Sequence, residues 1–134
     1  MIISIDGPAA SGKSTTARLL AKKLDFIHLN TGLYYRAITY IFIKNNLFDS
    51  NQSTIDDFFS KNNIELKGER LNQVFWNEIN ISSFLFENII NEKIHITSNN
   101  VMIREKLVSM QRLIGQANNI VCEGRDIGSV VFPN

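Results

Sequence analysis

Eight residues near the N-terminus have the composition and spacing of a phosphate-binding loop. The segment Gly7-Pro8-Ala9-Ala10-Ser11-Gly12-Lys13-Ser14 fits the pattern G-x-x-x-x-G-K-S/T. Its glycines let the backbone turn so that N–H groups face a phosphate, and the start of the following helix adds positive partial charge. We expect Lys13 to reach the β- and γ-phosphates and the Ser14 hydroxyl to bind Mg²⁺. The alternative is a glycine-containing loop that only joins a strand to a helix.

The residues around this loop have the periodicity of a strand and a helix. Ile2–Ile5 is a short apolar run, which is typical of a buried strand in a parallel sheet. Residues 14–24 carry apolar side chains at helical spacing, on one face: Ala17, Leu20, Ala21 and Leu24. The loop therefore has the strand and the helix that a phosphate site requires.

The next elements repeat this order. A second strand is predicted at residues 26–29 and a second helix at about 33–44, with Asn30 or Thr31 as the helix cap. The alternation of strands and helices predicts an α/β fold in which parallel strands are joined by crossover helices.

The later part of the chain is less regular at first. Residues 48–82 are rich in Asn, Ser and Asp, and predict a small insert with short antiparallel strands. Helices are then predicted at residues 84–97 and 101–117, followed by a buried strand at 120–122.

Two arginines follow predicted strand ends. Arg36 comes one helical turn after the second strand, and Arg125 comes just after the strand at 120–122. Ligands of open α/β sheets bind outside the carboxyl ends of the strands, so we expect both guanidinium groups to point toward the phosphate loop. Two convergent arginines suit a second phosphate. The loop alone leaves open whether the phosphate acceptor is water, a nucleotide or a small metabolite.

Composition excludes several classes of protein. The 134 residues are 44% hydrophobic, and 14 Lys and Arg against 13 Asp and Glu give a net charge of +1, without the basic excess of nucleic-acid binders. One cysteine, Cys122, excludes an intrachain disulfide. The apolar runs are far shorter than the roughly 20 residues of a membrane span. The first residues lack the features of a signal peptide, so we expect a cytoplasmic protein.

Three segments together resemble the bacterial cytidylate kinases, a family of P-loop nucleoside monophosphate kinases. They are Asp6–Ser14, Asn30–Ala37 and Glu123–Pro133. The last is the most specific, because adenylate, guanylate and shikimate kinases do not carry G-R-D-x-G-x-V-V-F-P. The resemblance implies a parallel sheet with flanking helices and a small β-containing insert. Residues 1–134 would form an incomplete P-loop kinase domain, with a core of residues 1–47 and 83–134 and a CMP-binding insert of residues 48–82.

The resemblance also implies a reaction and roles for individual residues. The reaction is phosphoryl transfer from ATP, with Mg²⁺, to CMP or dCMP. We also expect a monomer, and the charge and the short apolar runs predict that it binds neither nucleic acid nor membrane. The catalytic residues would be Lys13, Arg125 and Asp126. ATP would contact Gly7, Pro8, Ala9, Ala10, Ser11, Gly12, Lys13, Ser14 and Thr15. CMP would contact Thr31, Arg36, Arg104, Arg125 and Asp126, with Arg104 on the cytosine.

Several of these side chains have a purely structural alternative. Arg104 is also explained as a solvated charge on a helix, and Asp126 as a turn cap. Asp6 is a candidate metal neighbour or a hydrogen-bonding loop residue. The two histidines, His28 and His95, and the one cysteine are interpreted as structural.

The sequence departs from the family pattern in ways that bear on function. Asn30 stands where the family has Asp, His95 where we align a serine that reads the cytosine, and Phe86 where we align an arginine. The family also continues beyond V-V-F-P, with the last core strands and an arginine-rich lid, so we expect a truncated form. The alternatives are an inactive nucleotide-binding fragment and a P-loop kinase with another small acceptor.

Overall fold

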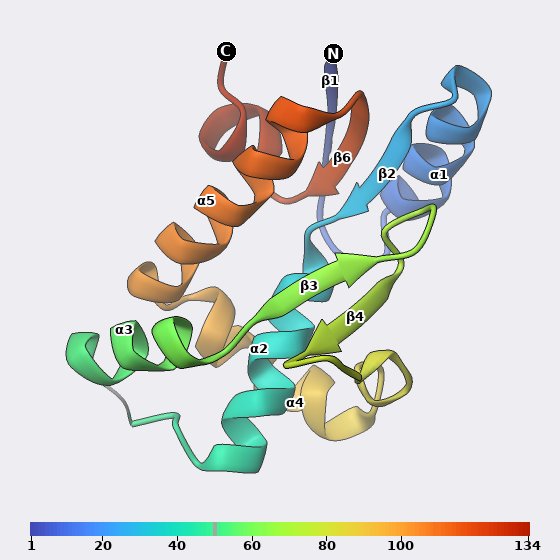
Figure 1. Ribbon diagram of the computed structural model, residues 1–134. Coiled ribbons are helices and arrows are strands. Elements are labelled where there is room, and N and C mark those ends of the chain that lie inside the picture. The colour runs from blue at the N-terminus through green and yellow to red at the C-terminus, as the bar shows by residue number, and fades with distance from the viewer. Residues whose placement is uncertain (50) are drawn as a thin grey trace. The chain divides into compact units, whose positions relative to one another are not determined.

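The computed structural model describes residues 1–49 and 51–134 (Figure 1). The chain folds into two compact units. The first unit comprises residues 1–32, 68–72 and 108–134, and the second comprises residues 33–67 and 73–107. Each unit contains one three-stranded sheet. The division at residues 48 and 82 that the sequence suggests stays a prediction.

The sheet of the first unit is parallel, as predicted. Its strands are β1 (Ile2–Asp6), β6 (Ile120–Gly124) and β2 (Ile27–Asn30), in the order β1-β6-β2. Asp6 pairs in register with Gly124, and Asn30 with Glu123. Because all three strands run in one direction, their carboxyl ends lie at one edge of the sheet. The segments that follow β1, β2 and β6 therefore begin at this edge.

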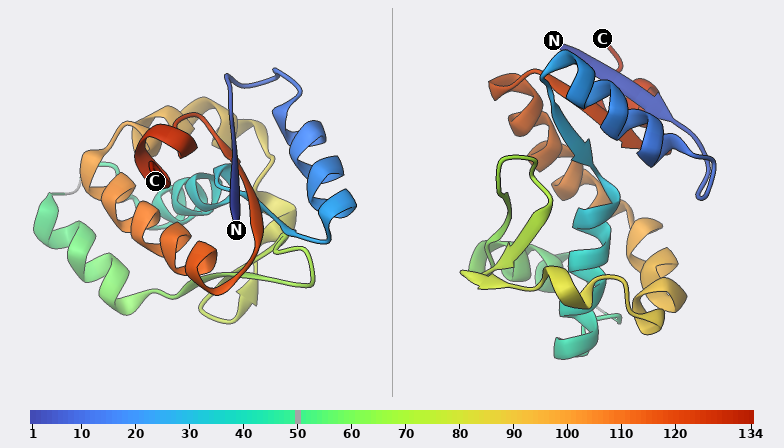
Figure 2. Two further views of the ribbon diagram at one scale, coloured as in Figure 1. Left: turned by 90° about the horizontal axis from the view of Figure 1, so that it is seen from above. Right: turned by 90° about the vertical axis from the view of Figure 1, so that its right-hand side faces the viewer.

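Helix α1 (Lys13–Leu24) covers the sheet with small side chains and contacts β6 and β2. Ala17 and Ala21 are 0% and 2% exposed and cluster with Val121 of β6. Figure 2 shows α1 running alongside β1 and β6 in both views. Alanines at this contact let the helix backbone approach the sheet closely, which holds the loop before α1 at the sheet edge.

The chain returns to the first unit through the second half of α5 (Val101–Ala117), a helix whose predicted bounds are confirmed. A Cβ atom on Gly115 would lie 2.8 Å from the ring of Phe132, so a larger residue here would force that ring to shift. The Arg112 guanidinium donates to the carbonyl oxygens of Val131 and Val130, at 2.8 Å each. These contacts fix the C-terminal segment against α5.

The second unit is built around α2 (Gly32–Asn45), which lies within one residue of its predicted bounds at each end. Its buried face packs on its neighbours: the ring of Phe42 meets that of Phe58 edge to face at 5.2 Å. A hydrogen bond of 2.7 Å joins Thr39 of α2 to Thr97 of α4 (Asn88–Ser98).

The insert sheet is antiparallel, as predicted, with the order β3 (Ile64–Lys67), β4 (Gln73–Trp76) and β5 (Ile79–Asn80). The two residues between β4 and β5 both have positive φ, as a tight hairpin turn requires. Alternate side chains of β3 are buried, which matches the apolar–polar alternation in the sequence.

No helix was predicted from the sequence in the segment before this sheet. Residues 52–61 form a helix, α3 (Gln52–Lys61). Asn51 caps it by accepting a hydrogen bond from the Thr54 N–H at 3.0 Å, and Ile55 and Phe58 are its buried residues. The helix was not predicted because the segment is mostly polar and has only one apolar pair at i, i+3 spacing, Ile55 and Phe58.

The helix predicted over residues 84–97 begins later than expected. Residues 82–84 form a single 3₁₀ turn, and α4 starts at Asn88. Leu85 and Ile90 are buried, whereas Ile89 and Ile96 are each 38% exposed. The interpretation of Leu85, Ile89 and Ile96 as one apolar side of this helix was therefore wrong for Ile89 and Ile96, because the buried side of α4 carries Ile90 and Thr97. No helix among residues 1–49 and 51–134 is long and apolar enough to cross a membrane.

Candidate functional site

The loop between β1 and α1 has the strand–loop–helix setting that the phosphate-binding motif requires. Gly12 is the N-cap of α1 at φ 85°, a left-handed conformation that favours glycine. The Gly7 N–H donates to the Gly124 carbonyl oxygen at 3.1 Å, which ties the loop to the end of β6. Lys13 Nζ donates to the Pro8 carbonyl oxygen at 3.2 Å, across the loop. Backbone N–H groups of the first turn of α1 and the lysine ammonium thus belong to one short segment.

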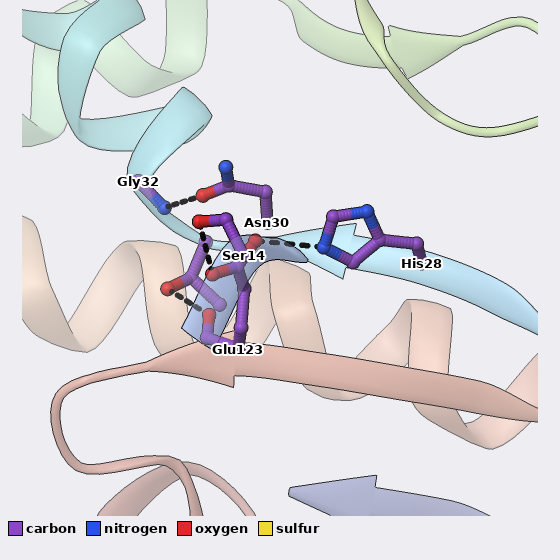
Figure 3. Close-up of polar contacts among 6 residues, drawn as sticks. Ser14, His28, Asn30, Gly32 and Glu123 are labelled. Carbon is purple, nitrogen blue, oxygen red and sulfur yellow. Dashed lines mark hydrogen bonds and ion pairs between the residues drawn. The ribbon is translucent and has the colours of Figure 1, made fainter. Parts of the chain in front are cut away.

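Glu123, at the end of β6, connects this loop to β2. Its side chain is 1% exposed, and each of its carboxylate oxygens has a partner. Ser14 Oγ donates to Oε2 at 2.6 Å, and His28 Nε2 lies 2.7 Å from Oε1 (Figure 3). Burial by itself raises the pKa of Glu123, but the hydrogen bonds from His28 and Ser14 and the nearby charges of His28 and Lys13 hold that pKa below its ordinary value. Glu123 is therefore a buried, ionised carboxylate beside the loop serine.

The chain just before α2 is hydrogen-bonded to the backbone of Glu123. Thr31 donates to the Glu123 carbonyl oxygen with its hydroxyl, at 2.9 Å, and with its N–H, at 3.3 Å. The Asn30 side chain accepts from the Gly32 N–H at 3.0 Å (Figure 3). Of the two predicted caps, Asn30 therefore binds the start of the helix, and Thr31 is buried against β6 instead.

Asp6 fixes the loop that carries Arg125 and Asp126. Its Oδ1 accepts from the Ile127 N–H at 2.6 Å, and its Oδ2 accepts from the Gly128 N–H at 2.9 Å. Asp6 was a candidate metal neighbour or a hydrogen-bonding loop residue, and these contacts show it in the second role. Asp126 begins the helical turn η2 (Ile127–Val131), and its carbonyl oxygen accepts from the Val130 N–H at 2.9 Å. Arg125 is exposed at the end of β6.

The double contact of Asp6 makes a prediction for stability. Asp6→Asn replaces one acceptor oxygen by an NH₂ group, which faces a backbone N–H and cannot accept from it. We expect the free energy of unfolding, measured by urea denaturation, to fall by about 1–2 kcal/mol. The matched control is Asp25→Asn, because Asp25 is exposed at φ 56°, a conformation that asparagine tolerates. A loss in Asp6→Asn no larger than in the control would contradict this role.

The second unit holds the other two arginines of the predicted site. Arg36 Nη1 donates to the Leu85 carbonyl oxygen at 2.9 Å and to Asn91 Oδ1 at 2.8 Å. The Phe86 ring lies 4.5 Å from Arg36 Cζ. Burial lowers the pKa of Arg36, but a guanidinium stays protonated in proteins. Both hydrogen-bond partners are neutral oxygens, so these two contacts leave its positive charge uncompensated. Arg104 donates to the Ser98 carbonyl oxygen at 3.3 Å and is half-buried rather than fully solvated.

The predicted site residues fall into both units. The loop, Thr31, Arg125 and Asp126 lie in the first unit, and Arg36 and Arg104 lie in the second. Hydrogen bonds bring the ends of β1, β2 and β6 together with the loop. The assembly of the four charged residues into one acceptor site stays a prediction.

Ser14 of the loop and Glu123 of β6 fit a magnesium ion. A hydroxyl and a carboxylate, on Ser14 and Glu123, lie 2.6 Å apart, and both are the hard oxygen donors that Mg²⁺ prefers. Since Ser14 donates its own hydrogen to Glu123, the lone pairs of its oxygen remain for a cation. No group of three or more His, Cys, Asp or Glu side chains suited to a metal occurs within the described residues. The fit is thus to an ion that takes most of its ligands from water and phosphate.

Glu123 and His28 were not among the predicted site residues. Glu123 was visible in the sequence only as part of the segment that carries Arg125. Strand alternation is the sequence signal that could have found them. With Asn30 of β2 paired to Glu123 of β6, alternation puts His28, Asn30 and Glu123 on the same face of the sheet. That face is the one that α1 covers. Cys122, which precedes Glu123 on β6, is fully buried, and burial together with the charges of Asp6 and Glu123 raises its pKa to about 12.

A glycine loop with Lys13 and Ser14, at the carboxyl edge of a parallel sheet and at the start of a helix, defines the class of P-loop nucleotide-binding proteins. Within this class, the sequence profile described as "Cytidylate kinase" matches residues 3–134. The chain belongs to the cytidylate kinase family.

Individual relatives show the same similarity. The chain is 38% identical over 134 residues to a protein named cytidylate kinase from Fusobacterium nucleatum subsp. nucleatum, with all of this chain and 60% of that relative covered. It is 41% identical to the cytidylate kinase of Listeria innocua, with 98% and 59% covered. It is 40% identical to the cytidylate kinase of Chloroherpeton thalassium, with 100% of this chain and 57% of that relative covered. The chain therefore spans about 60% of the length of the curated relatives it matches.

Proposed function

We propose that this chain belongs to an enzyme that transfers the γ-phosphoryl group of ATP to CMP or dCMP, giving ADP and CDP or dCDP. The observation that carries the proposal is the hydrogen bond of 2.6 Å between Ser14 of the P-loop and the buried carboxylate of Glu123. Ser14 and Glu123 would supply oxygen ligands for a nucleotide-bound magnesium ion at the loop. Membership of the cytidylate kinase family supports cytidine nucleotides as acceptors.

The donor half of the reaction falls to the first unit. Residues 7–15 would surround the phosphates of ATP, with backbone N–H groups donated by the loop residues after Pro8, which has no N–H itself. Lys13 would leave the Pro8 carbonyl oxygen to bind the β- and γ-phosphates. Ser14 and Glu123 would hold Mg²⁺, which when bound neutralises charge on the phosphates. Such transfer needs positioning and compensation of charge more than a strong base. The buried carboxylate and the helix start both serve positioning.

The acceptor half falls to the arginines and their neighbours. Arg36 and Arg125 would bind the phosphate of CMP, and Arg104 and Asp126 would read the cytosine, with Thr31 beside them. Arg36 supports this assignment, because its present partners are neutral oxygens and its charge is available to a phosphate. Residues 48–82 would act as the CMP-binding insert, in a cytoplasmic monomer.

An acceptor panel tests this function on the full-length protein. With ATP and Mg²⁺, we expect CMP and dCMP to be phosphorylated with kcat/KM at least about 100-fold above AMP, GMP or shikimate, because a site that hydrogen-bonds its substrate strongly rejects one that leaves its polar groups unpaired. The readout is ADP formation together with chromatographic detection of the product. Equal rates with AMP or shikimate would overturn the cytidine assignment. ATP binding without transfer to any acceptor would indicate a binding protein instead.

A further inference from the structure

The contact between His28 and Glu123 is not explained by phosphate binding alone. His28 lies on β2 with its side chain 20% exposed, and Glu123 lies on β6 with its side chain 1% exposed. The ring nitrogen Nε2 is 2.7 Å from Oε1, while the other carboxylate oxygen, Oε2, accepts from Ser14 at 2.6 Å (Figure 3). The three residues form a chain from β2 to α1 that passes through one buried carboxylate.

The direction of these hydrogen bonds follows from the chemistry of the groups. An ionised carboxylate only accepts, so the hydrogen of the contact with His28 is carried by Nε2. Ser14 must likewise donate to Oε2. Two donors on opposite oxygens fix the rotation of the carboxylate about its terminal bond. Without His28, a buried oxygen of Glu123 would lack its partner, and the carboxylate would turn toward whatever donor it could reach.

We propose that His28 is a positioning residue, which holds the Glu123 carboxylate in the orientation at which it accepts the hydrogen of the Ser14 hydroxyl. In this orientation the lone pairs of the Ser14 oxygen remain available to the metal of Mg·ATP. The inference rests on the proposed function of the loop. Outer partners that orient a group at a metal site commonly change metal affinity by 10- to 100-fold, roughly, when they are removed. His28 occupies that place here, since it contacts Glu123 and Glu123 contacts Ser14.

A purely structural role for His28 predicts something different. If the histidine only satisfied a buried carboxylate, its removal would lower stability and would weaken ATP binding equally with and without metal. If it positions Glu123 for the metal, its removal weakens the metal-dependent part of ATP binding. The decisive quantity is therefore the ratio of the ATP dissociation constants measured in EDTA and in Mg²⁺.

The experiment titrates ATP calorimetrically into the 134-residue chain and, in parallel, into the full-length protein. His28→Phe keeps a ring but has no donor. His28→Asn introduces an amide donor on a side chain that is too short to reach Glu123. In His28→Gln the amide nitrogen can take the place of Nε2. We expect the first two variants to lower the ratio roughly tenfold and His28→Gln to restore most of it. ATP binding in EDTA should stay at the wild-type level in all three.

The outcomes separate the inference from the function on which it rests. Wild-type protein that binds Mg·ATP, with an unchanged ratio in His28→Asn and His28→Phe, overturns the role of His28 alone. An equal loss in EDTA and in Mg²⁺ overturns it as well, in favour of a structural role. Wild-type protein that binds no ATP in either condition overturns the proposed function itself. If His28→Phe does not fold, the comparison of His28→Asn with His28→Gln decides.

Discussion

Lys13→Ala will weaken the binding of Mg·ATP by about 100-fold or more. A desolvated charge pair commonly contributes 2–5 kcal/mol, roughly, when one partner is truncated, and each 1.4 kcal/mol is about tenfold in affinity. Lys13 is the ammonium group of the loop, and its Nζ donates to the neutral carbonyl oxygen of Pro8 at 3.2 Å. A phosphate is a stronger partner than that carbonyl, so we expect the lysine to change partners when ATP binds.

Calorimetric titration of ATP into wild-type and variant protein measures this effect. The matched control is Lys22→Ala, which removes an exposed lysine from the last turn of the same helix. The control removes the same charge far from the loop, so ATP affinity should stay at the wild-type level. Unchanged affinity in Lys13→Ala would reject the phosphate-binding interpretation of the loop, and with it the proposed function.

Arg125→Ala will raise the KM for CMP by roughly 10- to 100-fold in the full-length protein, and will change the KM for ATP much less. Arg125 is exposed directly after β6, in the loop that Asp6 holds through the N–H groups of Ile127 and Gly128. Because the backbone of this loop is held, only the side chain of Arg125 has to be ordered when it binds a phosphate. Its removal should therefore appear in the binding of the acceptor.

Steady-state kinetics with CMP and ATP varied in turn provide the measurement. Arg18→Ala is the matched control, since Arg18 is exposed on α1 and has no assigned part in the site. Both KM values should remain at the wild-type level in this control. An equal rise of both KM values in Arg125→Ala would contradict its role in acceptor binding and would indicate a general effect on the fold.

Elements with strong periodicity or strong end signals were predictable from the sequence. The parallel strands, the helix after the loop and the bounds of α5 all follow from apolar spacing, which reports directly which side of an element is buried. α3 was missed because its buried pair, Ile55 and Phe58, stands in a polar segment. The start of α4 was misplaced because the 3₁₀ turn at Ser82–Phe84 has no comparable signature in one sequence.

The sequence by itself determined that the chain has a P-loop with Lys13 and Ser14 in place, because that loop is a local structure whose glycines, helix start and lysine are neighbours along the chain. Only the tertiary structure decided that Glu123 joins Ser14 to His28 and that Asp6 holds the loop of Arg125. Ser14 and Glu123 are 109 positions apart, and Asp6 and Ile127 are 121 apart. Such pairs depend on strand order and register, which put His28 and Glu123 on the same face of the sheet and Asp6 of β1 beside Gly124 of β6.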